Sequence, residues 1–289
     1  MEDSEILKLK EENIILKKQI ADSKDLAAKA ANLKHTVKTL RRNFQGMVQL
    51  LTETISLDNL FLGSHMRRTA EMTKAFCEFL KLPKDTVFLN YYAALLHDIG
   101  LVGSNSAVIE KNYNELNNDD KAVFKEHPIA GYEIINSIYN LKRTAVIIRS
   151  HHENYDGTGF PDKLASGEIP KESRIIRIIN DYDISKFKLS LQIEDSCSKI
   201  ENGSEKFYDP ELVNSFLSFI SHFEKSNTGS AKSINYEDLK PGMYISQDIL
   251  LSNGLMLIPS GVILDKGMIE KIHSFSSKLV GNGFIHVTY

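Results

Sequence analysis

Histidines that lie next to other metal-binding residue types are the most distinctive chemical feature of this sequence. His97 is followed by Asp98, and His151 is followed by His152. The stretch before His97, residues 92–96, is apolar, so an imidazole and a carboxylate placed there lose hydration energy unless something pairs with them. A divalent metal ion would be such a partner, because imidazole nitrogen and carboxylate oxygen are common ligands. We therefore expect a metal site at His97 and Asp98.

Six of the nine histidines fall in the middle of the chain, and five of these have settings that suit a metal site. A single histidine of this kind is more often an ordinary core or surface residue than a ligand. Five in one segment, with two adjacent and one in a His-Asp pair, favour a shared metal site. The five are His65, His97, His127, His151 and His152, whereas His222 is expected to be ordinary.

A glycine-rich stretch follows His152 directly. It contains Asp156, Gly157, Gly159, Phe160 and Pro161. Glycines allow backbone N–H groups to approach a phosphate or a guanine edge closely. The alternative is a plain turn, but the position directly after two candidate ligands favours a loop that faces a substrate.

A series of amphipathic helices must position these residues. The apolar spacing predicts helices over 67–80, 86–97, 130–139, 142–152 and 210–223, with His127 and Pro128 at a helix start. The segment 174–183 is short and strongly apolar, and its pattern also fits a buried strand. Residues 52–225 are therefore expected to form one all-helical domain.

The first 51 residues contain no proline, one glycine and many Lys, Glu and Ala residues. Their apolar residues follow heptad spacing, which predicts a coiled coil and a homodimer formed through it, with Asn13 at a core position. The alternative is one long helix that packs on its own domain. The heptad positions are Ile6, Leu9, Leu16 and Ile20 in a first run, and Leu26, Ala30, Leu33, Val37, Leu40, Phe44, Met47 and Leu51 in a second.

The pattern changes again after the polar linker 226–230. Short apolar runs such as 243–245 and 284–287 are separated by Pro-Gly and Asn-Gly turns, which predicts a small β-rich domain over 234–289 with one helix at 266–275. The expected fold class is mainly α, with a coiled-coil helix at 1–51, the helical domain at 52–225 and this β-rich domain.

Composition narrows the class of protein. Apolar residues make up 42% of the chain, charged residues 25%, and the net charge is −3, which disfavours a binder of nucleic-acid polymers. Cys77 and Cys197 have no metal-type spacing, which is typical of a reducing compartment. No apolar run reaches the roughly 20 residues of a membrane span, and the charged N-terminus does not fit a secretory signal. We expect a cytoplasmic protein without membrane insertion.

Several motifs in order resemble the HD-GYP family over residues 55–223. That family is a branch of the HD superfamily of metal-dependent phosphohydrolases, and its usual substrate is cyclic di-GMP. The resemblance implies an all-helical domain and phosphodiester hydrolysis by metal-activated hydroxide. It is carried by His97-Asp98-Ile99-Gly100, by His127-Pro128 with Gly131, and by HHENYDGTGFPDKLASGEIPKESRI at 151–175.

The resemblance also implies roles for individual residues. His97 and Asp98 would be the catalytic pair, and two divalent metal ions, with iron or manganese favoured, would bind at the motif positions. Members with three ions carry a Glu four residues before the first histidine, where this chain has Phe61. The implied ligands are His65, His97, Asp98, His127, His151, His152 and, at the last ligand position, Asn180. The implied substrate contacts are Asp156, Gly157, Gly159, Phe160, Pro161, Lys186 and Lys188.

Four positions depart from the family pattern. Asn180 replaces an Asp ligand, and Asp181 beside it would point about 100° away on a helix. Leu101 replaces a Lys that would lie near the phosphate, and Phe160 replaces the Tyr of the signature. Lys186 and Lys188 stand where the family has an Arg-Pro-Tyr string, and they could supply point charges but no bidentate contact.

These departures leave three functions open. One is a cyclic di-GMP phosphodiesterase, whose activity Asn180 and Leu101 put in question. The second is a catalytically degenerate member that serves as a cyclic di-GMP receptor or as a scaffold for a protein partner. The third is hydrolysis of a related nucleotide phosphate, since one fold can serve several substrates.

Overall fold

The computed structural model describes residues 2–227, 232–253, 256–264, 266–280 and 284–288. Two compact units are present, Met1–Glu53 and Thr54–Tyr289. Linker residues 228–230, and the side chains of Ile6, Leu9 and Ile20, lie outside what is described.

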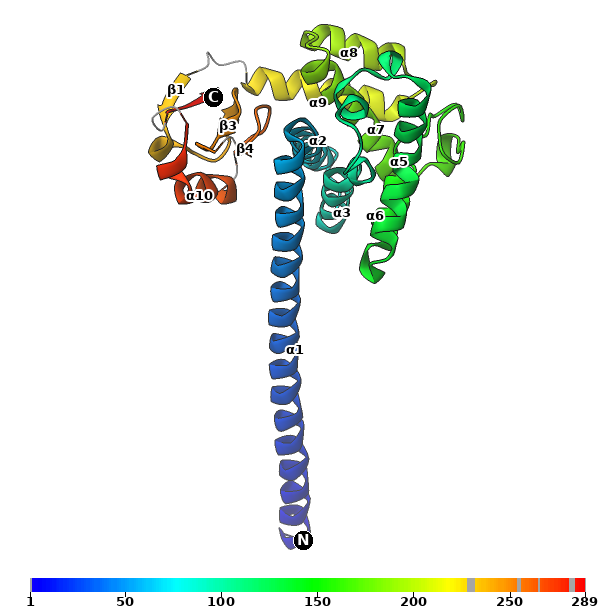
Figure 1. Cartoon of the computed structure of the whole chain (residues 1–289). Helices are drawn as coiled ribbons and strands as arrows, with labels where there is room; N and C mark the ends of the chain where they lie inside the picture. The colour runs from blue at the N-terminus through cyan, green and yellow to red at the C-terminus, as the bar shows by residue number, and fades with distance from the viewer. Residues whose placement is uncertain (1, 228–231, 254–255, 265, 281–283, 289) are drawn as a thin grey trace. The chain divides into compact units, whose positions relative to one another are not determined.

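Helices make up most of the chain, as the sequence predicts (Figure 1). The α-helices are α1 (Glu2–Asp58), α2 (Leu60–Phe79), α3 (Lys84–Leu96), α4 (Ser106–Glu110), α5 (Asn118–Asn136), α6 (Lys142–Arg149), α7 (Lys171–Asp183), α8 (Ile193–Asn202), α9 (Pro210–Asn227) and α10 (Lys266–Ser274). Short helical turns are η1 (Ile99–Leu101), η2 (Tyr113–Glu115), η3 (Tyr139–Leu141), η4 (Ser166–Glu168), the π-helical η5 (Ile184–Lys188), η6 (Tyr236–Asp238) and η7 (Ser276–Lys278).

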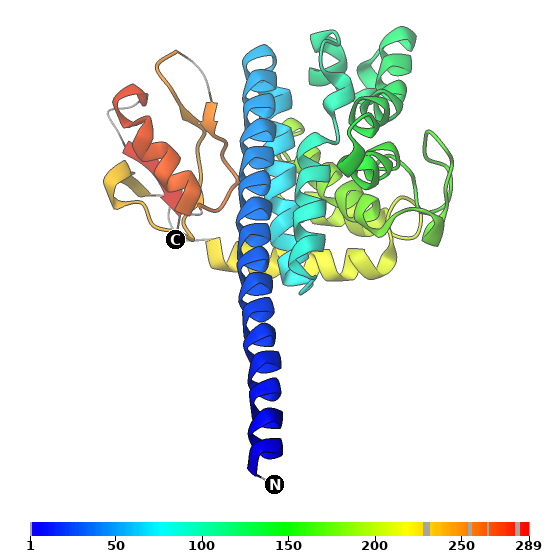
Figure 2. The ribbon, with the colours of Figure 1, turned by 90° about the horizontal axis from the view of Figure 1, so that it is seen from below.

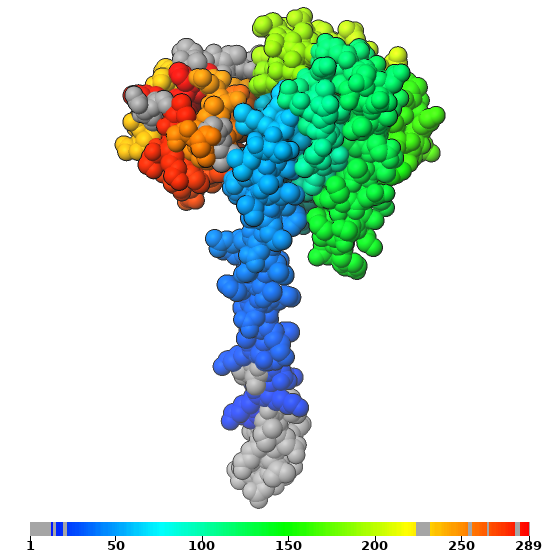
Figure 3. Space-filling model, in the orientation of Figure 1, coloured from blue at the N-terminus to red at the C-terminus, as the bar shows by residue number. Residues whose placement is uncertain are grey.

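The helix α1 is continuous over 57 residues, because no proline and only Gly46 interrupt it. Figure 3 shows this part of the chain in space-filling form. Several of its predicted heptad positions carry exposed apolar side chains. Leu26 is 69% exposed, Leu33 65%, Leu40 63% and Met47 71%.

The helix α2 begins at Leu60, earlier than the predicted 67–80. Asn59 causes this start, because its side-chain oxygen accepts a hydrogen bond from the Leu62 N–H at 2.8 Å and caps the helix. His65 therefore lies on the helix and not in the segment before it. In Figures 1 and 2, α2 and α3 run side by side.

The segment 174–183 is helical and not a strand. It belongs to α7, whose buried residues Ile175, Ile178, Ile179 and Tyr182 follow helical spacing. They form a core with α2, α8 and α9, in which the Phe216 ring meets the Tyr182 ring at 5.3 Å. Arg177, Asn180 and Asp183 of the same helix contact the candidate site.

His127 and Pro128 do not start a helix, which corrects the sequence-based prediction. They lie inside α5, which begins nine residues before His127 because Asn117 caps it through the Asp120 N–H at 2.8 Å. A proline inside a helix cannot donate to the carbonyl four residues earlier. That carbonyl belongs to Phe124, and the His127 side chain donates to it instead.

The C-terminal segment contains the small sheet region that the sequence predicts, and it belongs to the unit Thr54–Tyr289. Strand β5 (Phe284–Thr288) pairs antiparallel with β1 (Lys232–Asn235) and β2 (Tyr244–Ile245), in the order β1-β5-β2. Strands β3 (Ile249–Leu250) and β4 (Met256–Ile258) form a separate antiparallel pair. An apolar core between these strands and α10 includes Ile245, Ile272 and Val287.

Candidate metal centre

The five candidate histidines and Asp98 meet at one buried point, although four different helices carry or precede them. His65 comes from α2, His97 and Asp98 follow α3, His127 comes from α5, and His151 and His152 follow α6. All six side chains are buried. Helices that are far apart in the sequence therefore bring together the residues singled out by type and spacing.

Three of the histidines share one orienting contact. The Nδ1–H of His97 donates to the Ala94 carbonyl at 2.7 Å, three residues earlier. His151 makes the same contact with Ile148, and His127 makes it with Phe124. Carbonyls at a helix end or before a proline lack a helical donor, so they are open to such bonds. In each case the bond fixes the ring and leaves the Nε2 lone pair for the centre.

His65 is oriented by a side chain and not by its own helix. Its Nδ1 donates to Asp183 Oδ2 at 2.7 Å. Arg68 holds the same carboxylate with two hydrogen bonds, of 2.7 Å from Nε and 3.0 Å from Nη2. Burial opposes ionisation of Asp183, but Arg68 and His65 outweigh it and keep its pKa below the ordinary value. Arg68 and Asp183 were not singled out from the sequence.

The two oxygens of Asp98 face different histidines. Oδ1 lies 3.2 Å from His127 Nε2 and 3.7 Å from His151 Nε2. Oδ2 lies 3.3 Å from His97 Nε2 and 3.5 Å from His65 Nε2. Burial opposes ionisation, but His97 and the hydrogen bonds from the histidines hold the pKa of Asp98 well below its ordinary value. The carboxylate is thus ionised and shared.

Two groups of candidate ligands result, and we name them the first half and the second half. In each group, ligand atoms lie within 4.8 Å of one another. Among the described residues, Asp98 is the only carboxylate in either group. The first half is His65, His97 and Asp98, and the second half is Asp98, His127, His151 and His152.

Asn180 lies next to the first half. Its Oδ1 lies 3.0 Å from His65 Nε2, and its amide nitrogen donates to Asp181 Oδ1 at 3.1 Å, which turns the oxygen toward the histidines. The Asp181 carboxylate also accepts from the Tyr208 hydroxyl at 2.7 Å and lies 3.3 Å from Arg177. Asp181 is therefore engaged elsewhere and does not stand in for the missing carboxylate.

The donor set fits a divalent cation in each half. The Nε2 atoms of His127 and His151 lie 3.1 Å apart, and those of His65 and His97 lie 3.3 Å apart. Since the Nδ1 atoms of these rings donate, the neutral rings present only acceptors at Nε2. Two acceptors this close repel each other unless a proton or a metal ion lies between them. Imidazole nitrogens and a shared carboxylate match the preferences of iron, manganese or zinc.

The two halves differ in electrostatics. Burial alone would lower the pKa of His97, but the charge and hydrogen bond of Asp98 outweigh it and raise the pKa above 6.5. In the second half, burial lowers the pKa of His151 to about 3. Burial, reinforced by His151, His127 and Arg177, also holds the pKa of His152 well below 6.5. The His151 and His152 rings of the second half are therefore uncharged at neutral pH, so they do not repel a cation.

His152 has a different hydrogen-bonding state from the other histidines. Its Nδ1 lies 2.7 Å from the Arg177 guanidinium, which can only donate, so the proton of the neutral ring is on Nε2. The ring of Phe160 stacks on it at 4.9 Å and 19°. The sequence analysis does not single out Arg177. The feature that could have pointed to it is a charged residue between isoleucines in an otherwise apolar run.

Glycines allow the elements around Asp98 to approach closely. A Cβ atom on Gly100 would lie 2.1 Å from the His127 carbonyl oxygen and 2.8 Å from the Gly131 nitrogen. Only glycine lets η1 lie this close to α5. This contact places Asp98 beside His127.

The predicted substrate loop divides into two parts. Asp156 is an exposed turn residue whose carboxylate accepts from the Thr158 N–H at 2.9 Å, and Gly157 has a φ of +81°. Backbone bonds to Lys206 and Phe207 anchor this part. These contacts match the plain-turn alternative for Asp156 and Gly157.

The second part of the loop lies against the ligands. A Cβ on Gly159 would lie 2.2 Å from the Asn154 nitrogen, so the chain passes closely under the residues after His152. Phe160 follows, stacks on His152, and donates its N–H to the His152 carbonyl at 3.3 Å. Pro161 comes next in a cis peptide bond.

The two lysines of η5 have different surroundings. Lys188 donates to the Ile109 carbonyl at 2.8 Å and lies 5.5 Å from the centre of the Phe61 ring. Burial lowers its pKa, and the first opposing charge is that of Asp98. Lys186 instead lies over the rings of Tyr182 and Phe187, at 5.9 and 5.7 Å.

Leu101 stands where the resemblance implies a lysine, and it is buried in an apolar cluster. Its exposure is 3%, and its cluster includes Leu62, Val108 and Ile109. The Lys188 ammonium reaches the backbone of Ile109 in the same cluster. The Lys188 ammonium therefore reaches the apolar cluster that contains Leu101, the position where the resemblance implies a lysine.

Comparison with known proteins identifies the family. The model of the HD domain family matches residues 49–212, which is more than half of the chain. The chain belongs to the HD domain family. The ordered motifs and the relatives place it in the HD-GYP type.

Three curated relatives illustrate the similarity. The cyclic di-GMP phosphodiesterase response regulator RpfG of Xanthomonas campestris is 29% identical over 161 residues, covering 54% of this chain and 42% of the relative. A cyclic di-GMP phosphodiesterase of Vibrio cholerae is 32% identical, covering 54% and 35%. The 3'3'-cGAMP-specific phosphodiesterase 2 of the same species is 26% identical, covering 62% and 35%. The chain thus spans less than half the length of these relatives.

Among the residues that the structure describes, no helix is both long enough and apolar enough to cross a membrane.

Proposed function

We propose that this chain is a metal-dependent phosphodiesterase that hydrolyses cyclic di-GMP. The observation that carries the proposal is the Asp98 carboxylate, which turns one oxygen to each of two histidine groups. Two cations that share a carboxylate are the arrangement used to hydrolyse phosphodiesters. The names of the relatives support a cyclic dinucleotide as the substrate.

Two divalent ions would bind, and iron or manganese is favoured. His65, His97, Asp98 and Asn180 would hold one ion, and Asp98, His127, His151 and His152 would hold the other. When bound, the ions would supply an activated hydroxide and neutralise the charge that develops on the phosphate. His152 would join as a ligand through Nε2 by moving its proton to Nδ1, which would break its hydrogen bond from Arg177.

The chain itself would hold the anionic substrate. Lys188 is a half-buried ammonium whose charge interacts with Asp98, and Arg177 is a guanidinium beside His152. Two cations near the centre suit a phosphodiester bound there. We propose that Lys188 and Arg177 replace two cations of the family pattern. One is the lysine expected at position 101, and the other is the arginine of the Arg-Pro-Tyr string.

Phe160 would orient the substrate and the second half together. Its ring is stacked on His152, so it both fixes that imidazole and presents an aromatic wall next to it. Aromatic walls favour the stacking of bases. Gly159, Pro161, Asp156 and Gly157 would act through the shape of the loop.

The test is metal analysis paired with a hydrolysis assay on protein purified under low oxygen. We expect about two metal ions per chain and linear cleavage of cyclic di-GMP, and no cleavage by a His127→Gln control. Less than one ion per chain together with no turnover would contradict the proposal. Tight binding of cyclic di-GMP without turnover would instead support the degenerate receptor. Preferential cleavage of 3'3'-cGAMP would show that the substrate is a different cyclic dinucleotide.

We also propose that two copies associate through α1. The exposed apolar residues Leu26, Leu33, Leu40 and Met47 repeat at heptad spacing along one helix. A second copy of the same helix would cover this stripe in a coiled coil. Light scattering should show a dimer that becomes a monomer when residues 1–45 are deleted, and an unchanged mass would contradict the proposal.

A further inference from the structure

We infer that the C-terminal β domain is a positioning part of the first half of the metal centre. It would act by holding Arg68, which holds Asp183, which in turn orients His65. This inference rests on the proposed metal site. It gives a role to a domain in which no residue suggests chemistry of its own.

The first supporting contact lies directly beside His65. Ser64 Oγ is 3.1 Å from Met256 Sδ, and Arg67 Nη1 donates to the Leu257 carbonyl at 3.4 Å. Met256 and Leu257 belong to β4. Ser64 and Arg67, which flank His65 on α2, therefore contact strand β4 of the β domain.

The second contact lies on Arg68 itself. The guanidinium carbon of Arg68 is 4.1 Å from the centre of the Phe187 ring, a distance at which a cation and an aromatic face attract. The turn at Gly261 closes on both groups. A Cβ there would lie 2.7 Å from Phe187 Cζ and 3.3 Å from Arg68 Cδ. The β domain thus packs against the side chain that grips Asp183.

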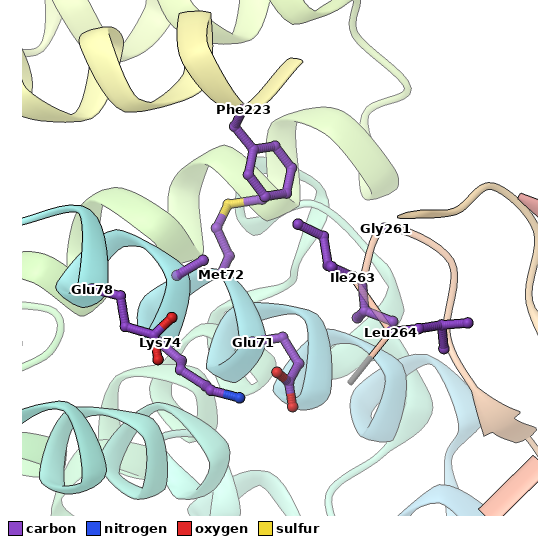
Figure 4. A pocket seen from close by; sticks show the side chains of 10 residues that line it. Glu71, Met72, Lys74, Glu78, Phe223, Gly261, Ile263 and Leu264 are labelled. Carbon is purple, nitrogen blue, oxygen red and sulfur yellow. The ribbon is translucent and has the colours of Figure 1, made fainter. Parts of the chain in front are cut away.

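A third contact fixes the next turns of α2. Ile263 packs on the core that contains Met72 and Phe223, and Tyr244 packs on the same core. Figure 4 shows Gly261, Ile263 and Leu264 on one side of a pocket, with Met72 and Phe223 facing them. The β domain therefore contacts α2 both at His65 and farther along the helix.

The consequence should be confined to one half of the centre. His65 depends on Asp183 for its orientation, whereas His127 and His151 use carbonyls of their own helices. Loss of a residue that orients a ligand typically costs about 10–100-fold in metal affinity. A disturbed β-domain contact should weaken the first half and spare the second.

Two glycines of the β domain provide a matched pair for the test. Gly261 has a φ of +87° and Gly242 a φ of +93°, so alanine is strained at both. A Cβ on Gly242 would meet nothing within 4 Å, whereas one on Gly261 meets Phe187 and Arg68. Gly242→Ala therefore controls for strain alone.

The measurement is Mn²⁺ affinity of the full chain by chelator competition. In Gly261→Ala we expect one of two Mn²⁺ ions to bind about 10-fold more weakly, and in Gly242→Ala neither. Equal affinities in the two variants would overturn the inference. If Gly261→Ala does not fold, Phe187→Leu removes the η5 ring that lies against both Gly261 and Arg68, without backbone strain, and unchanged affinity there would overturn the inference.

A metal-free readout separates this inference from the proposed function. In ¹⁵N-histidine spectra of the apo-protein, the His65 Nδ1–H should be protected in the wild type and in Gly242→Ala, but exchange faster in Gly261→Ala and Phe187→Leu. If the wild type binds no Mn²⁺, the proposed function fails while this readout still decides the inference. Equal exchange in all four proteins would overturn it.

Discussion

The two halves of the metal centre are oriented in different ways. In the second half, His127 and His151 bond to carbonyls three residues earlier on their own helices. In the first half, His97 does the same, but His65 depends on Asp183 and Arg68. Local orientation survives whenever its helix forms, whereas orientation by a distant carboxylate requires the correct packing of α2, α7 and η5. The first half is therefore the half that the rest of the molecule can disturb.

Charge separates the halves as well. Both share Asp98, but the first half has the neutral Asn180 at the position where the resemblance implies a carboxylate. A neutral carbonyl oxygen attracts a divalent ion less strongly than a carboxylate does. We expect the first half to bind its ion more weakly, and the following experiments test that difference.

Removal of Asp98 should have the largest effect, because it belongs to both halves. Asp98→Ala is expected to leave less than one ion per chain and to lower hydrolysis by more than about 100-fold, since such ions contribute several kcal/mol. Metal analysis and the hydrolysis assay check this. His222→Ala, at an exposed histidine expected to be ordinary, is the control and should leave both values unchanged. Two retained ions would show that Asp98 is not shared.

Removal of one histidine from each half should separate the two ions. His127→Gln should lose the second-half ion, and His97→Gln the first-half ion, because each takes one buried imidazole from one group only. Chelator titration of each variant should show one remaining ion, held more tightly in His97→Gln than in His127→Gln. The reverse order of affinity would contradict the proposed difference between the halves.

Restoring a carboxylate should strengthen only the first half. Asn180→Asp places a charge 3.0 Å from His65 Nε2, and a charged contact of this kind contributes ~1.5–3 kcal/mol, or at least about 10-fold in affinity. The control is Asp181→Asn, because that carboxylate already pairs with Tyr208 and Arg177. Titration with Mn²⁺ should show tighter binding only in Asn180→Asp. An equal change in both variants would show a general effect of charge.

The lysines of η5 should show the smallest effect. Lys188→Met is expected to lower kcat/KM for cyclic di-GMP by about 10-fold, since one charged hydrogen bond contributes ~1.5–3 kcal/mol. Lys186→Met, whose ammonium lies over the Tyr182 and Phe187 rings, should change it little. Steady-state kinetics on both variants decide between the two lysines. A larger loss in Lys186→Met would reverse the assignment.

Much of the centre could be predicted because its residue types are unusual for a buried setting. His97, Asp98, His151 and His152 stood out from the sequence, and the structure brings them together. The sequence also predicts the three classes of segment, since heptads, amphipathic helices and turn-rich strands have different periodicities. The roles of these residues as metal ligands remain predictions.

Other features depend on tertiary packing and leave little local signal. Pro128 suggested a helix start, but a freed carbonyl that accepts from His127 makes the proline compatible with the interior of α5. The short apolar run of α7 also fits a buried strand by its sequence pattern. Its packing against α2, α8 and α9 is a tertiary feature that the pattern does not contain. Arg68 and Asp183 are 115 residues apart, so their pairing could not be read from spacing.

The central claim is that the Asp98 carboxylate lies between two cations. Anomalous diffraction from crystals grown under low oxygen with Mn²⁺ tests it most directly. We predict two peaks, one near Asp98 Oδ2 with His65 and His97, and one near Oδ1 with His127 and His151. A single peak, or two peaks of which one does not touch Asp98, would contradict it.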